Sequence, residues 1–178
     1  MAEMFATAKH PFYNSTDIMS LGVIDPAKYA AFAESFFVGA GRPFDEQAFR
    51  RLYDRFEGVT WYVQRVLNWI WNTGAGLVES LQVDEAVTSL VEDRALVFRD
   101  LLDSQPEVAK CLLPLMARRQ KVQSPTAAEF LLEAGLSASS VRSALADLVA
   151  RDIVYRSSDG YQVYERLFDE WLRGKGVS

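Results

Sequence analysis

Two short alternating runs near the end of the chain constrain the fold more than any other feature. Residues 153–156 and 161–164 alternate apolar and polar side chains as strands do, and residues 157–160 between them (SSDG) are typical of a hairpin turn. An amphipathic segment follows at residues 167–172. We therefore predict a small β-hairpin close to the C-terminal end of a chain that is otherwise helical.

Three helical segments precede the hairpin. Residues 104–107 (SQPE) have the pattern of a capping box and predict a helix that Pro114 would kink or shorten. A second, short helix is predicted from Ser124, and Gly135 predicts a tight turn after it. A third helix is predicted over residues 137–150, where apolar side chains recur at helical spacing. Three helices with a glycine turn between the second and third, followed by a hairpin, are the order of a winged helix-turn-helix.

The middle of the chain predicts a bundle of further helices. Asp25 before Pro26 predicts a capped helix start, and another helix is expected from Phe44. Residues 60–73 are apolar almost all round, which predicts a central, buried helix. The acidic stretch 79–103 carries a further apolar set. The predicted fold class is mainly α: a helical bundle followed by a winged helix-turn-helix with its hairpin.

Composition narrows the classes of function. The 178 residues include one Cys and one His, which excludes a disulfide framework and a Cys/His zinc cluster. The net charge is −5, so the whole chain is not a polycation directed at nucleic acid. Residues 105–178 hold ten Lys or Arg against nine Asp or Glu, while the first 104 residues hold nine against fifteen. With no apolar run of membrane length and no signal-peptide pattern, we expect a cytoplasmic protein without a membrane partner.

Motifs for catalysis are missing from the sequence. It contains no G-x-x-x-x-G-K-[ST] phosphate loop, no G-x-S-x-G and no H-E-x-x-H, and its lone His10 has no second His to work with. We therefore expect no catalytic residue, no metal site and no enzyme activity in this chain by itself.

The segment around Gly58 admits two interpretations. A Gly directly before an aromatic-rich helix start lets a backbone approach a ligand, and the free N–H groups of a helix start favour an anion. The alternative is that Gly58 ends the preceding helix and the aromatic side chains belong to the core. The spacing by itself favours that second interpretation.

The predicted third helix of the winged region could contact DNA. Small hydroxyls and one cation lie near its start, and further cations lie before it and in the hairpin, which suits contact with phosphates and base edges. Nearby Asp147, Asp152 and Asp159 oppose this, so docking to a protein is the other interpretation. The candidate contact residues are Arg118, Arg119, Lys121, Ser139, Ser140, Arg142 and Arg156.

Five segments in a fixed order resemble a known family. They are residues 9–16 (KHPFYNST), 56–64 (FEGVTWYVQ), 138–145 (ASSVRSAL), 153–156 (IVYR) and 160–164 (GYQVY). Together they resemble the C-terminal part of the archaeal-type AAA+/STAND P-loop ATPases, in which a helical lid and a winged helix follow the nucleotide-binding core. The resemblance covers nearly the whole chain, but the phosphate loop and the Walker B strand of the family are missing from it.

The resemblance implies a division of the chain and a candidate site. Residues 1–24 would be an arm or strand left from the ATPase core, 25–103 a lid-like domain with its connector, and 104–178 the winged helix. ATP and Mg²⁺ are implied for a parent protein, with neither held by this chain alone. The lid residues that would face the nucleotide are, by motif match, Gly58, Thr60, Trp61, Tyr62 and Gln64.

Three functions remain open from the sequence. The first is a non-catalytic lid plus winged helix that relays the nucleotide state of a P-loop core to DNA or to a protein partner. The alternative is a stand-alone winged-helix transcriptional regulator that binds double-stranded DNA and dimerises through its helical half. The third is a protein-interaction module whose exposed apolar side chains make it a homo-oligomer.

Overall fold

The N-terminal half folds into four helices. The structure is a computed structural model that describes residues 22–74 and 76–175. Asp25 caps the first of the four, since its carboxylate accepts a hydrogen bond from the backbone N–H of Lys28 at 3.0 Å and Pro26 takes the first helical position, as predicted. The helices are α2 (Pro26–Gly39), α3 (Glu46–Arg55), α4 (Thr60–Thr73) and α5 (Ser80–Glu92).

Helix α4 has the predicted bounds but is less buried than its sequence suggests. Val63, Val66 and Ile70 are fully buried, whereas Trp61 and Trp71 are 49% and 43% exposed. The prediction of a helix buried all round is therefore wrong. The reason is that the main neighbours of α4 are α3 and α5, which leave the two ends of another face open to solvent.

The acidic stretch forms α5 and a further helix, α6 (Ala95–Asp103), before the chain enters α7 (Glu107–Arg119). The predicted capping box at residues 104–107 is wrong. Ser104 ends α6, with its hydroxyl donating to the carbonyl of Leu101 at 2.7 Å, and Pro106 occupies the N-cap position of α7. Only three residues separate the two helices, so the serine serves the first of them. Helix α7 continues through Pro114 to its end.

The order predicted for the winged region is confirmed. Helix α8 (Ala128–Ala134) begins four residues after the Ser124 start expected for it, and Gly135 then adopts a left-handed conformation. Helix α9 (Ala138–Ala150) is capped by Ser137. Strands β1 (Val154–Ser157) and β2 (Gly160–Val163) pair antiparallel, and β2 also exchanges two backbone hydrogen bonds with Val122 through Tyr161.

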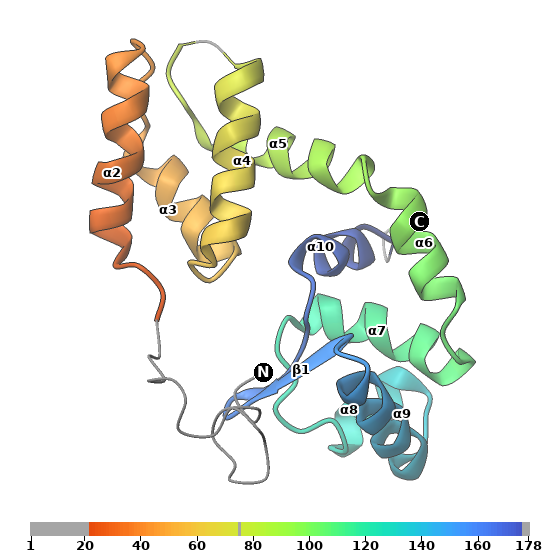
Figure 1. Ribbon diagram of the computed structural model, residues 1–178. Helices are drawn as coiled ribbons and strands as arrows, with labels where there is room; N and C mark the ends of the chain where they lie inside the picture. Colours follow the sequence, from red (N-terminus) through yellow and green to blue (C-terminus); the bar gives the residue numbers. More distant parts are fainter. Residues whose placement is uncertain (1–21, 75, 176–178) are drawn as a thin grey trace, which may run out of the picture.

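The last helix, α10 (Arg166–Lys175), holds the two halves of the molecule together. It packs against α5 and α6 on one side and against α7 and β2 on the other, and Figure 1 shows it lying between them. The rings of Phe168 and Trp171 contact that of Phe98 from α6, with centroids 5.5 and 6.1 Å away. The buried apolar side chains of both halves consequently form one continuous core.

The arm expected over residues 1–24 lies almost wholly outside the described residues, and the three-part division of the chain stays a prediction. None of the helices in residues 22–74 and 76–175 is long and apolar enough to cross a bilayer.

Because α10 contributes to both halves, we predict that Phe168→Ala destabilises the whole molecule in one transition. Phe168 is 1% exposed, and truncating such a side chain costs about 3–5 kcal/mol of unfolding free energy. The measurement is urea unfolding followed by far-UV circular dichroism. Leu132→Ala is the control, since that side chain is 86% exposed and its loss should change the free energy by no more than about 0.5 kcal/mol. Two separate transitions in the variant would contradict the single core.

Candidate functional site

The turn before α4 is built around Gly58. Glu57 and Gly58 both have left-handed backbones, with φ of 51° and 69°. A Cβ at Gly58 would lie 2.5 Å from the hydroxyl of Tyr53, so a larger side chain would collide with that ring. The N–H of Gly58 donates to the carbonyl of Tyr53 at 2.9 Å, and that of Val59 to Phe56 at 3.0 Å. These two donors are therefore engaged within the chain. Helix α3 itself ends at Arg55 with Phe56 as its C-cap, so Gly58 lies in the turn that follows the helix end and not at the end itself.

The structure brings together only part of the predicted nucleotide-facing set. Trp61 and Tyr62 line one cleft of about 500 Å³ beside the hairpin, and their rings meet edge to face at 4.8 Å. Gln64 does not line this cleft. It lines a groove with α2 and, together with Trp61, a further pocket on α4, whereas Thr60 lines none of the three. The guanidinium of Arg65 lies 5.3 Å from the Trp61 ring.

Tyr62 joins the turn to the start of α10. Its hydroxyl accepts a hydrogen bond from the backbone N–H of Arg166 at 3.0 Å, and its ring stacks on Phe56 at 5.2 Å. Burial raises the pKa of the Tyr62 phenol, which keeps the hydroxyl protonated at neutral pH. Glu57 completes the connection, because its carboxylate accepts from the guanidinium of Arg166 at 2.6 Å and from the amide of Gln162 at 3.0 Å.

Sequence reasoning missed Glu57, Gln162 and Arg166. More than a hundred residues separate the first from the other two, and no local spacing rule connects side chains at that distance. The only signal was indirect, namely that Glu57 lies within the motif of residues 56–64.

A second set of charged side chains joins α10 to both halves. Arg55 of α3 bonds to Glu170 at 2.7 and 3.0 Å and to Asp84 of α5 at 2.8 Å. Burial opposes the charge of Arg55, but the hydrogen bonds and negative charges of its two partners outweigh it and raise the pKa of the guanidinium. On the other side, Arg173 bonds to Glu170 at 3.2 Å and donates to the carbonyl of Ala117 in α7 at 3.0 Å.

Asp169 is a deeply buried carboxylate in this set, and its negative charge is only partly compensated. It is 1% exposed, one of its carboxylate oxygens has no hydrogen-bond partner among the described residues, and the other accepts from Arg173. Burial raises the pKa of Asp169 from 3.8 to about 6, and the positive charges of Arg173 and Arg166 only partly oppose the shift. When the Asp169 carboxyl is ionised, it therefore lowers the free energy of unfolding of the protein.

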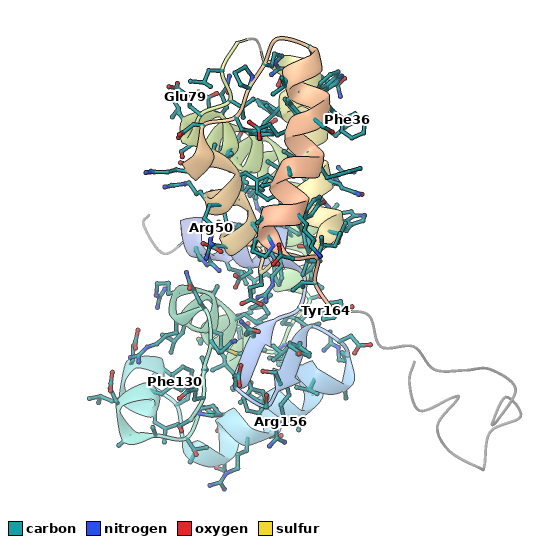
Figure 2. All side chains as sticks on the ribbon, turned by 90° about the vertical axis from the view of Figure 1, so that its left-hand side faces the viewer. Phe36, Arg50, Glu79, Phe130, Arg156 and Tyr164 are labelled. Carbon is teal, nitrogen blue, oxygen red and sulfur yellow. The ribbon has the colours of Figure 1, made fainter. Side chains whose placement is uncertain are left out.

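The start of α9 presents the predicted hydroxyls. The hydroxyl of Ser137 lies 2.9 Å from those of Ser139 and Ser140, so the three form a small cluster of their own. Arg142 is exposed beside them and forms no ion pair within residues 22–74 and 76–175. Figure 2 shows Arg156 on the hairpin at the far end of the molecule, and its guanidinium lies 5.4 Å from the ring of Tyr161.

The remaining candidate cations divide by partner. Arg119 is neutralised by Glu129 at 2.9 Å and by Glu133, and the Lys121 ammonium lies 3.6 Å from Asp159. Arg118 is exposed and unpaired with any described carboxylate. Three of the five cations predicted to contact DNA or a partner are therefore available for an external anion: Arg118, Arg142 and Arg156.

An apolar groove lies on the opposite half, between α2 and α4. Phe32, Phe36 and Trp71 are 60%, 58% and 43% exposed along it, and its volume is about 240 Å³. Figure 2 shows Phe36 projecting from α2 into solvent. Among the described residues, no group of three or more His, Cys, Asp or Glu side chains is arranged to hold a metal ion.

The raised pKa of Asp169 predicts that Asp169→Asn gains stability over the natural protein as the pH rises. Near pH 4 the carboxyl is only about half ionised in the unfolded chain and neutral in the folded one, so its effect on stability is still small and the two proteins should differ little. Between pH 4 and 7 the folded protein resists ionisation, so it loses free energy that the asparagine variant keeps. The gain should reach about 2–3 kcal/mol near pH 7.5, measured by urea unfolding at pH 4 and 7.5. A difference between the two proteins that is independent of pH would contradict the assignment.

Comparison with known proteins agrees with the architecture of the second half. A scan against family models matches residues 96–174 to a family described as a probable winged helix domain. A search of curated proteins found no match. The matched region begins in α6 and ends in α10, so it includes the three helices α7 to α9, the hairpin and the helix that returns to the first half. The chain is thus mainly helical, and its residues 96–174 are similar to this winged helix family and have the order of helices and hairpin that such a fold requires.

Proposed function

We propose that the chain is a non-catalytic relay: a lid-like helical bundle whose contact with a nucleotide-binding core is passed to its own winged helix, and from there to a partner. The parent would be an ATPase of the AAA+/STAND type, as the resemblance of residues 56–64 and of the winged region implies. ATP and Mg²⁺, when bound to such a core, would supply the chemistry.

The observation that carries this proposal is the connection between residues 57–62 and α10. Glu57 and Tyr62 belong to the segment that would face the nucleotide, and both bond to Arg166 at the first turn of α10. A shift of this segment would be transmitted to Arg166 through the half-buried Tyr62 hydroxyl and the exposed Glu57 carboxylate.

Helix α10 is suited to carry the movement as a rigid unit. It is bonded to α3 through Arg55 and Glu170 and to α7 through Arg173 and the Ala117 carbonyl. Its apolar side belongs to the same core as both halves. A displacement of the bundle would therefore take α10 with it and change the position of the winged helix as a rigid body.

The described residues do not form a phosphate cradle of their own. The N–H groups of Gly58 and Val59 donate to carbonyls within the chain, and the Glu57 carboxylate would repel a phosphate there. These contacts support the proposal that the chain touches a nucleotide bound by another segment of protein. No catalytic step is assigned to the residues of this chain.

The relay predicts that Tyr62→Phe loosens α10. The variant removes the hydroxyl that accepts from the N–H of Arg166, a loss of about 0.5–1.5 kcal/mol. Hydrogen exchange of amides in the first turn of α10 should become about three- to tenfold faster. The control is Trp61→Phe, because the neighbouring Trp61 forms no hydrogen bond to α10. Equal exchange in both variants would contradict the connection, and ATP turnover by the purified chain would contradict the non-catalytic assignment.

The surface of the winged helix predicts weak, non-specific affinity for duplex DNA. With three available cations, Arg118, Arg142 and Arg156, the logarithm of the binding constant should fall with the logarithm of salt concentration at a slope of about −3 or shallower. The measurement is fluorescence anisotropy of a labelled duplex at 50 and 200 mM salt. Arg142→Ala should weaken binding, whereas Arg151→Ala should not, since Arg151 already pairs with Asp147 at 3.2 Å. A slope near −6 would instead favour the stand-alone DNA-binding regulator.

A further inference from the structure

The groove between α2 and α4 is an apolar surface that the relay does not use. Its walls include Phe32, Phe36 and Trp71, and it shares no residue with the cleft that Tyr62 lines. Figure 1 shows α2 at the outer edge of the molecule, beside α4 and away from the winged helix. A contact made at this groove is therefore independent of the connection between Tyr62 and α10.

The exposed rings of the groove are held in place by other rings. Phe32 and Phe36 meet edge to face with their centroids 5.2 Å apart, and Trp71 meets the buried Phe37 in the same way at 5.1 Å. Aromatic side chains that are already fixed lose little conformational freedom when a partner covers them. Such side chains are typical of the few anchors that carry most of the binding energy of an interface.

Carboxylates are missing from this face, although the half of the molecule that contains it is acidic. The first 104 residues hold fifteen Asp or Glu against nine Lys or Arg. Helix α4 contains no carboxylate, and Glu34, the single one in α2, does not line the groove. Two identical acidic halves repel each other through their net charge, but across this groove no carboxylate of one copy would face a carboxylate of the other. The charge distribution therefore permits a second copy of the chain at this face.

The shape of the face is also suited to a second copy, because it carries both projections and a hollow. Phe32 and Phe36 are 60% and 58% exposed on the side of α2, and the hollow beside them has a volume of about 240 Å³. In a two-fold contact the same surface patch meets itself, so every contact is made twice. The rings of each copy would thus enter the hollow of the other.

The exposed aromatic area is large enough for a reversible dimer. Complete burial of an aromatic side chain removes about 150–250 Å² from water, so three rings that are about half exposed contribute roughly 300 Å² per copy. A standard interface buries about 800 Å² per partner, and about two-thirds of a homodimer interface is apolar. The three rings therefore supply more than half of the apolar area that such an interface requires.

We propose that two copies of this chain associate through the groove between α2 and α4, related by a two-fold axis, with Phe32 and Phe36 of each copy in the hollow of the other. Gln64 and Asn68 line the same groove, and their amides provide hydrogen-bond donors and acceptors for the contact without burying a charge.

Sedimentation equilibrium of the full chain over a hundredfold range of concentration tests the proposal. The average mass is expected to rise from that of one chain towards that of two. Phe32→Ser/Phe36→Ser should raise the dissociation constant of the dimer at least tenfold. Because both side chains are more than half exposed, the far-UV circular dichroism of this variant should remain that of the natural protein.

Asn68→Asp tests the charge argument without removing a ring. Asn68 is exposed, and an aspartate still accepts the hydrogen bond that the Asn72 amide donates to the Asn68 side chain at 3.1 Å. The variant places a carboxylate in the groove of both copies, and this repulsion should weaken the dimer at least tenfold at neutral pH. Gln47→Glu is the matched control, since it adds the same charge at an exposed position of α3 outside the groove and should leave the dissociation constant unchanged.

The control for the lost rings is Leu96→Ser/Val97→Ser, which removes two side chains that are 73% and 59% exposed on α6. This variant should dimerise as the natural chain does. A natural chain that stays monomeric over the whole range would overturn the proposal. So would a dimer that persists at full strength without Phe32 and Phe36 or with Asn68→Asp. A mass that rises beyond two chains would also overturn it, because a two-fold contact closes on itself.

Discussion

The buried charges of α10 are the constraint on which the rest of this structure depends. Asp169 and Glu170 lie between two halves of the molecule that are otherwise joined through α5 and α6. Glu170 pairs with Arg55 of α3, whereas Asp169 pairs with Arg173 of the same helix. Removing Glu170 would take two hydrogen bonds from the partly buried Arg55, whereas the ionised Asp169 carboxylate itself lowers the stability of the fold. The halves are therefore held in one relative position by groups that tolerate few other arrangements.

In the relay that we propose, this constraint is what would pass a movement from one half to the other. The aromatic cluster of Phe98, Phe168 and Trp171 supplies apolar burial, while the arginine contacts specify orientation. The turn at Glu57 and Gly58 lies directly against the start of the same helix. Helix α10 is therefore the single rigid element between a partner bound at this turn and a partner bound at the winged helix.

The surface of the winged helix differs from that of a dedicated DNA-binding protein. Two of its five candidate cations are neutralised by neighbouring carboxylates, and the hydroxyls at the start of α9 bond among themselves. The largest exposed apolar side chains lie instead along the groove between α2 and α4 and around the cleft beside the hairpin. In the relay that we propose, both features suit a protein segment as the partner of the winged helix, with DNA as the alternative.

The sequence by itself determined the local elements. Asp25 and Pro26 set the start of α2, Ser137 caps α9, and the turn before Gly160 sets the hairpin, because each of these signals acts within four residues. The same local reasoning failed at Ser104, where two helix ends compete for one hydroxyl, and along α4, where neighbours rather than composition decide burial. Only the tertiary structure decided that Arg55 of α3 reaches Glu170 and which end of α10 meets Tyr62. Those contacts join residues up to 115 positions apart, and such pairings follow from packing, which no periodicity records.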